Sequence, residues 1–86
     1  MSYVYETQRP NIFTEEGQRL FLKIRDNTQA LLKQAGAVRL QEMISGSCGD
    51  SWDMLACVDR MVELGELHEI RQENCAAQHR VFVANR

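Results

Sequence analysis

One stretch of the chain decides the fold, and it consists of Val58-Asp59-Arg60-Met61-Val62-Glu63-Leu64-Gly65-Glu66-Leu67. Apolar residues spaced three and four apart before Gly65 predict the last turns of an amphipathic helix. Glycine commonly ends a helix because it adopts the left-handed backbone conformation without a steric penalty. The residues that follow, 66–71, are short and β-prone. We therefore expect a helix that leads directly into a strand.

This helix begins after a cluster of turn residues, 45–49, where Asp50 or Ser51 is suited to cap it. The apolar spacing predicts an inward stripe of Met54, Cys57, Val58, Met61, Val62 and Leu64. The outward face is expected to carry Asp53, Ala56, Arg60 and Glu63.

Two further helices are expected upstream. A long one spans about 14–35, with Thr14 as its N-cap and Gly36 at its end. Its predicted apolar face consists of Leu20, Phe21, Ile24, Thr28, Leu31, Leu32 and Ala35. A brief second helix over 40–44 follows a short extended segment, 37–39.

The C-terminal part of the chain predicts an antiparallel hairpin. Residues 66–71 and 79–84 are β-prone runs joined by a polar stretch, 72–78. The chain is therefore expected to be mostly α with a small β-hairpin, in the order helix, strand, helix, helix, strand, loop, strand. Residues 1–13 are expected to form an N-terminal arm and 14–86 the domain. One core is expected to contain Leu20, Ile24, Leu31, Met43, Ile44, Met54, Val58, Met61, Leu67 and Val81.

This order of elements resembles the winged-helix variant of the helix-turn-helix. The stretch 58–67 is similar to the end of the recognition helix and the first wing strand of MarR-like bacterial regulators. Val38-Arg39-Leu40-Gln41-Glu42-Met43 resembles the entry to their second helix, and the resemblance covers roughly residues 18–84. It implies a winged-helix DNA-binding protein that regulates transcription. Regulators of that type also have dimerisation helices at both ends, which have no counterpart in these residues.

The charge distribution argues against a conventional DNA-binding surface. The net charge is −2, but residues 42–73 contain two basic and eight acidic residues. A winged helix inserts the front of its third helix into the major groove, and here the residues at that front are Asp50, Ser51, Trp52, Asp53 and Ala56. Aspartates in that place repel the phosphates of a duplex. The candidate DNA contacts are Arg9, Arg39, Ser51, Arg60, Arg71 and Arg80. The alternative is a winged-helix protein-interaction module that does not bind DNA and uses its acidic third helix or wing.

Neither an enzyme nor a cofactor protein is expected. His68 and His79 have no nucleophile at a suggestive spacing, and no phosphate-binding glycine loop or redox motif is present, so we expect no catalytic residue and no cofactor. Cys48, Cys57 and Cys75 lack zinc-site spacing and are expected to be reduced thiols. A metal site from Cys48, Cys75 and His79 has no recognisable spacing, so none is expected.

Location and assembly can also be predicted. No run of about 20 apolar residues and no signal peptide is visible, so a cytoplasmic protein without a membrane partner is expected. Tyr3, Tyr5 and Phe13 make the N-terminal segment unusually apolar. They either fold back over their own domain or form, with the first helix, the interface of a homodimer, and we favour the homodimer.

Overall fold

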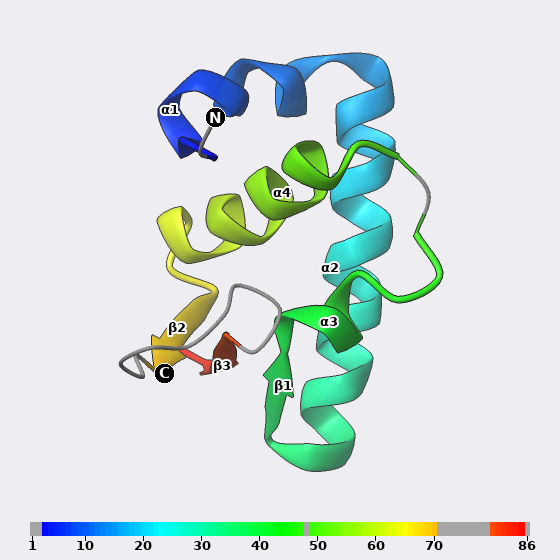
Figure 1. Ribbon diagram of the computed structural model, residues 1–86. Helices are drawn as coiled ribbons and strands as arrows, with labels where there is room; N and C mark the ends of the chain where they lie inside the picture. Colours follow the sequence, from blue (N-terminus) through cyan, green and yellow to red (C-terminus); the bar gives the residue numbers. More distant parts are fainter. Residues whose placement is uncertain (1–2, 48, 71–79, 86) are drawn as a thin grey trace.

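The computed structural model describes residues 3–47, 49–70 and 80–85 of the chain (Figure 1). These residues are mostly helical and carry a small antiparallel sheet, as the sequence predicts in outline. The elements are α1 (Tyr5–Gln8), the 3-10 helix η1 (Arg9–Phe13), α2 (Glu15–Ala35), β1 (Ala37–Arg39), α3 (Leu40–Met43), α4 (Ser51–Glu63), β2 (Leu67–Ile70) and β3 (Val81–Ala84).

Helix α2 has the ends that the sequence predicts. The Thr14 hydroxyl accepts a hydrogen bond from the Gly17 amide at 3.0 Å, which satisfies one of the free donors of the first turn. Gly36 follows the helix with φ of 77°, in the left-handed region that favours glycine. The buried side consists of Phe21, Ile24 and Thr28, whereas Ala35, expected on the apolar face, is exposed at the end of the helix.

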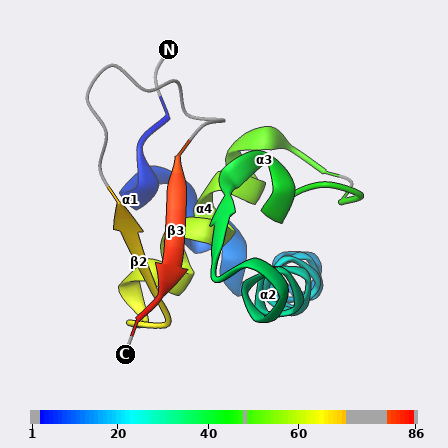
Figure 2. The same ribbon diagram turned by 90° about the horizontal axis from the view of Figure 1, so that it is seen from below.

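The sheet has three strands in the order β1-β3-β2, and both pairings are antiparallel (Figure 2). The predicted hairpin partners β2 and β3 are therefore present, and β1 adds a third strand. Phe82 in the central strand lies opposite Val38 of β1 and Glu69 of β2, and its side chain is fully buried. The predicted connection over 72–78 lies outside the described residues.

The buried side of helix α4 differs from the predicted one. Asp50 caps the helix by accepting a hydrogen bond from the Trp52 amide at 2.8 Å. Ala56, predicted to face outward, is completely buried because η1 packs along that side of α4. Leu64, predicted to face inward, is 47% exposed because it is the C-cap residue, where the chain turns away toward β2.

The expected N-terminal arm is instead a folded part of the domain. Residues 5–13 form α1 and η1, which lie along α4 on the side away from the sheet (Figure 1). Ile12 is 2% exposed and belongs to the core. Apolar side chains from both sides of residue 13 therefore share one core.

The predicted core is correct in its centre. Ile24, Met43, Val58, Met61 and Leu67 are buried, and Leu20, Leu31, Ile44 and Met54 pack against them partly exposed. Val81 is only half-buried, and its neighbour Phe82 fills the core in its place. Among the described residues no helix is long and apolar enough to cross a membrane.

Candidate functional site

Arg80 joins the sheet to α4 through two carboxylates. Its Nη2 lies 2.9 Å from Asp59 Oδ1 and 2.7 Å from Glu69 Oε1, and its Nε donates to Glu69 Oε2 at 2.9 Å. The three side chains are only 17–24% exposed. The hydrogen bonds that Arg80 donates to Glu69 first and then to Asp59 raise the pKa of Arg80 above its ordinary value, so the guanidinium stays charged. The cation also lies 5.1 Å from the centre of the Phe82 ring.

The N-terminal segment adds a hydrogen bond to the same cluster. The Tyr3 hydroxyl donates to Asp59 Oδ2 at 2.7 Å. Burial, together with this bond to a carboxylate, raises the pKa of Tyr3, so its hydroxyl keeps the proton that it donates. Asp59 is therefore held by both ends of the chain.

Glu63, at the end of α4, is a second centre of contacts. It lies 2.6 Å from Arg60 Nη1, 3.0 Å from Arg9 Nε, and accepts a hydrogen bond from the Tyr5 hydroxyl at 2.9 Å. These bonds, from Arg60 first and then from Arg9 and Tyr5, lower the pKa of Glu63 to about 2. Both guanidinium groups also lie over the Phe13 ring, at 5.0 and 5.2 Å from its centre.

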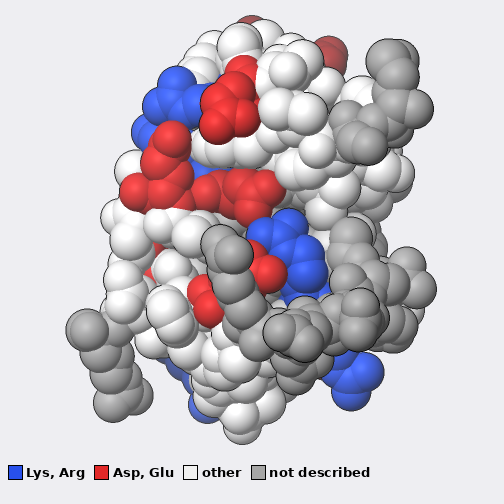
Figure 3. Space-filling model, turned by 60° about the vertical axis from the view of Figure 1, so that its left-hand side comes forward, with Lys and Arg blue, Asp and Glu red and all other residues white. Residues whose placement is uncertain are grey.

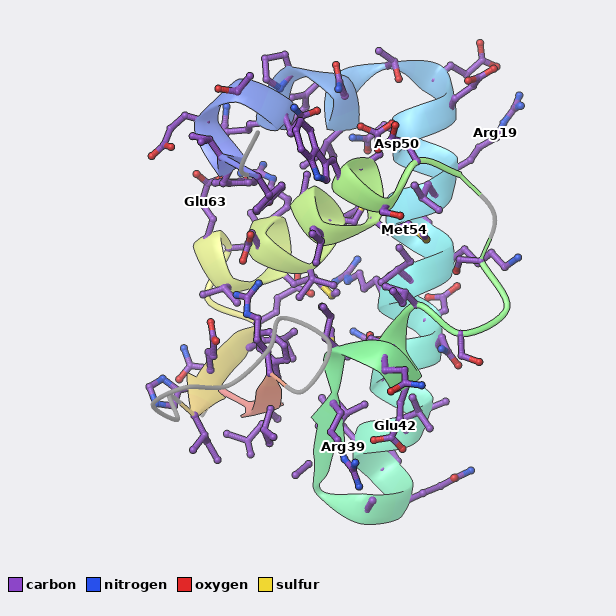
Figure 4. All side chains as sticks on the ribbon, viewed as in Figure 1. Arg19, Arg39, Glu42, Asp50, Met54 and Glu63 are labelled. Atoms are coloured by element: carbon purple, nitrogen blue, oxygen red, sulfur yellow. The ribbon has the colours of Figure 1, made fainter. Side chains whose placement is uncertain are left out.

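Three of the six predicted DNA-binding residues therefore form ion pairs with carboxylates of their own chain, namely Arg9, Arg60 and Arg80. Figure 3 accordingly shows acidic and basic side chains side by side on this face. Arg39 is 63% exposed, and its Nε lies 4.0 Å from Glu42 Oε1 at the start of α3 (Figure 4). Ser51 is exposed as the first residue of α4. Arg71 lies outside the described residues. The structure therefore does not assemble the five described members of this set into one basic surface.

The front of α4, meaning Asp50, Ser51, Trp52 and Asp53, borders a hollow of about 460 Å³. The hollow is lined by Asn11, Thr14, Glu16, Gly17, Leu20, Gly49, Asp50 and Asp53. Asp53 accepts a hydrogen bond from the Asn11 amide at 3.1 Å. Of the ion pairs between described residues, none involves Glu16, Asp50 or Asp53. Three carboxylates that no cation of the described residues neutralises therefore surround this hollow.

Gly17 sets the shape of one wall of that hollow. A Cβ atom there would lie 2.0 Å from the Asn11 carbonyl oxygen and 2.8 Å from the backbone of Ile12. Only glycine therefore allows η1 to approach the first turn of α2 so closely. This approach carries Asn11 to Asp53, and neither the local pattern nor the spacing of residues 1–13 predicts it.

The thiols and histidines offer no assembled site in the part of the chain that the structure describes. Cys57 is buried in α4, and burial first, then Asp53, raises the pKa of its thiol to about 12. No three His, Cys, Asp or Glu residues among those described lie in a group that would hold a metal ion. Cys48, Cys75 and His79 lie outside the described residues.

No family model, curated protein or solved structure matches the chain.

Proposed function

We propose that the chain is a winged-helix domain that binds a basic segment of a protein partner through the front of α4. The fold assignment is supported by the order α2-β1-α3-α4-β2-β3 and by a sheet whose strand order is β1-β3-β2. Helix α4 would be the recognition helix of such a domain, and the β2–β3 connection its wing. The interaction module that the acidic middle of the sequence indicates is thus preferred to a DNA-binding regulator.

The observation that carries this choice is that Arg9, Arg60 and Arg80 already have carboxylate partners. A phosphate that binds Arg80 would have to approach Asp59 and Glu69, both within 2.9 Å of the same guanidinium. Drawing Arg80 away would break its ion pairs with two partly buried carboxylates, which is costly. These internal ion pairs indicate that the three arginines stabilise the fold rather than bind nucleic acid.

The front of α4 differs from these ion pairs, because its carboxylates have no internal cation among the described residues. Asp50 and Asp53 have no cation of their own among the described residues, and Glu16 lies across the same hollow. A Lys or Arg side chain of a partner would gain charge-assisted hydrogen bonds there without displacing an internal cation of that part of the chain. Trp52, in the first turn of α4 between Asp50 and Asp53, is half-buried. A basic peptide segment is therefore the partner that suits this surface.

DNA binding is the second candidate, favoured by the strand order of the sheet and by the exposure of Arg39 and Ser51. It would depend on residues at the edges of the surface and would make few phosphate contacts. Its affinity would then fall only slowly with added salt, since the salt slope scales with the number of neutralised phosphates.

A pair of titrations tests the proposal. Trp52 is the only tryptophan of the chain, so its fluorescence reports directly on the front of α4. We expect a peptide of alternating Arg and Gly to change this emission at low salt, and an alternating Glu and Gly peptide to leave it unchanged. A duplex of mixed sequence should not bind at the same salt concentration. Saturable duplex binding without peptide binding would overturn the proposal in favour of DNA.

A further inference from the structure

One flank of α2 is largely exposed in the described part of the molecule, although Gln18 donates a hydrogen bond to the Ile12 carbonyl oxygen at 2.7 Å. Spacing by three and four residues places the flank on a single stripe that consists of Glu15, Gln18, Leu22, Arg25, Gln29 and Lys33. At its middle Arg25 reaches Glu66, with 2.9 Å between Nε and Oε1, beside the turn between α4 and β2.

Exposed apolar side chains gather along this flank. Five large hydrophobic side chains are strongly exposed among the described residues, and three of them, Phe13 (50%), Leu22 (50%) and Leu64 (47%), border the stripe. Phe13 and Leu64 line the same hollow as Gln18. A concentration of exposed apolar surface on one side of a small domain is typical of an interaction site.

Two hollows lie on either side of the Arg25–Glu66 pair. One, of about 320 Å³, is lined by Ile12, Phe13, Gln18, Phe21, Arg60 and Leu64. The other, of about 430 Å³, is lined by Thr28, Gln29, Leu32, Lys33, Met61, Glu66, Leu67 and Ala84. In chain order Leu22 lies between the α2 residues that line the first hollow and those that line the second.

The charges of the stripe are complementary to those of a reversed copy. Its N-terminal end has Glu15, with a side chain that is 82% exposed, and its C-terminal end has the exposed Lys33. At the middle, Arg25 is held by Glu66 of its own chain. When two such helices run antiparallel, Lys33 of each copy approaches the Glu15 end of the other. The opposed helix dipoles favour the same orientation.

From this self-complementarity we infer that the chain forms a two-fold homodimer in which the α2 flanks pack antiparallel. Leu22 of each copy then enters the hollow lined by Gln29 and Leu32 of the other. A standard interface buries roughly 800 Å² of each partner, which is about a seventh of the 5767 Å² surface of this chain. The predicted dimer thus uses the first long helix and Phe13, whereas Tyr3 and Tyr5 are engaged within their own chain.

Sedimentation equilibrium of Leu22→Glu against Ile70→Glu tests the inference. Both side chains are about equally exposed, but Ile70 lies in β2, four residues past Glu66 and outside both hollows. We expect the native chain and Ile70→Glu to form dimers. Leu22→Glu should raise the dimer dissociation constant by roughly a hundredfold, because the side chain is lost twice in each dimer. A monomeric native chain, or equal effects of the two variants, would overturn the inference.

A charge exchange tests the antiparallel orientation separately from the folding of each variant. Glu15→Lys and Lys33→Glu each place like charges together in a homodimer and should weaken it. In a mixed dimer the introduced lysine of one copy lies near the introduced glutamate of the other. The unchanged Lys33 of the first copy then faces the unchanged Glu15 of the second, so mixing the variants in equal amounts should restore a dimer. Failure of the mixture to associate more tightly than either variant alone would contradict the antiparallel arrangement.

Discussion

Arg80 and Asp59 lie 21 residues apart in the chain and form an ion pair of 2.9 Å between Nη2 and Oδ1, with only about a fifth of either side chain exposed. The pair connects the start of β3 to the middle of α4. Because Glu69 of β2 holds the same guanidinium at 2.7 Å, one cation fixes both strands of the hairpin against the helix. Arg80, which the sequence predicts as a DNA contact on the wing, therefore links the hairpin to α4 within the domain.

The first prediction follows from that role. Arg80→Ala should lower the free energy of unfolding by about 2 kcal/mol, because the partly buried Asp59 carboxylate would lose its 2.9 Å ion pair with Arg80. Arg39→Ala is the matched control, and it should change stability by less than about 0.5 kcal/mol since Arg39 is exposed. Urea denaturation measures both. Equal effects of the two substitutions would show that Arg80 has no structural role.

The second prediction concerns acid stability. The folded-state pKa of Glu63 is about 2, below its ordinary value of 4.5, so its ionised form stabilises the fold above about pH 4.5. This contribution is lost as the pH falls from 4.5 toward 2. Glu63→Gln should therefore be less stable than the native chain at pH 7, and the difference should shrink through that window. A constant difference from pH 7 down to pH 2 would contradict the lowered pKa.

The third prediction tests the N-terminal segment. Ile12→Ala should cost roughly 2–5 kcal/mol of stability, as expected for a large apolar side chain lost from a closed core. Val4→Ala, at a position 46% exposed in the same segment, should cost much less. Thermal unfolding followed by circular dichroism measures both changes. Similar small effects would mean that residues 3–13 are not part of the core in solution.

The fourth prediction concerns the thiols. In a chain with both Cys48→Ser and Cys75→Ser, Cys57 should react with a disulfide reagent only after unfolding. Its burial and the raised pKa of about 12 keep the thiolate scarce at neutral pH. Fast modification of the folded variant at pH 7 would contradict the position of Cys57 in α4.

The helices were predictable because their signals are local. Thr14 and Gly36 mark the ends of α2, and Asp50 and Gly65 mark those of α4, within a few residues of the apolar periods they bound. The hairpin was predictable for the same reason. What the sequence did not indicate was the packing of η1 on α4, since nothing in the local pattern of Ala56 distinguishes a small buried residue from an outward one.

The candidate site was harder to predict than the fold because its contacts join distant parts of the chain. Tyr3 and Asp59 are 56 residues apart, and Tyr5 and Glu63 are 58 apart. The sequence shows the excess of acidic residues but not which of them have a cation nearby. Within the described ranges Asp59 and Glu63 are neutralised internally, whereas Asp50 and Asp53 are not. That difference distinguishes the carboxylates that stabilise the fold from those of the proposed binding surface.

The most direct test of the proposed function compares the native chain with the double variant Asp50→Asn and Asp53→Asn in parallel titrations. The variant should keep its helix cap, because asparagine caps as well as aspartate does. Loss of the two charges should weaken binding of the alternating Arg and Gly peptide by at least about tenfold, as two charge-assisted contacts imply. Stronger binding of mixed duplex DNA by the variant, with peptide binding unchanged, would contradict the proposal and show that the front of α4 faces nucleic acid.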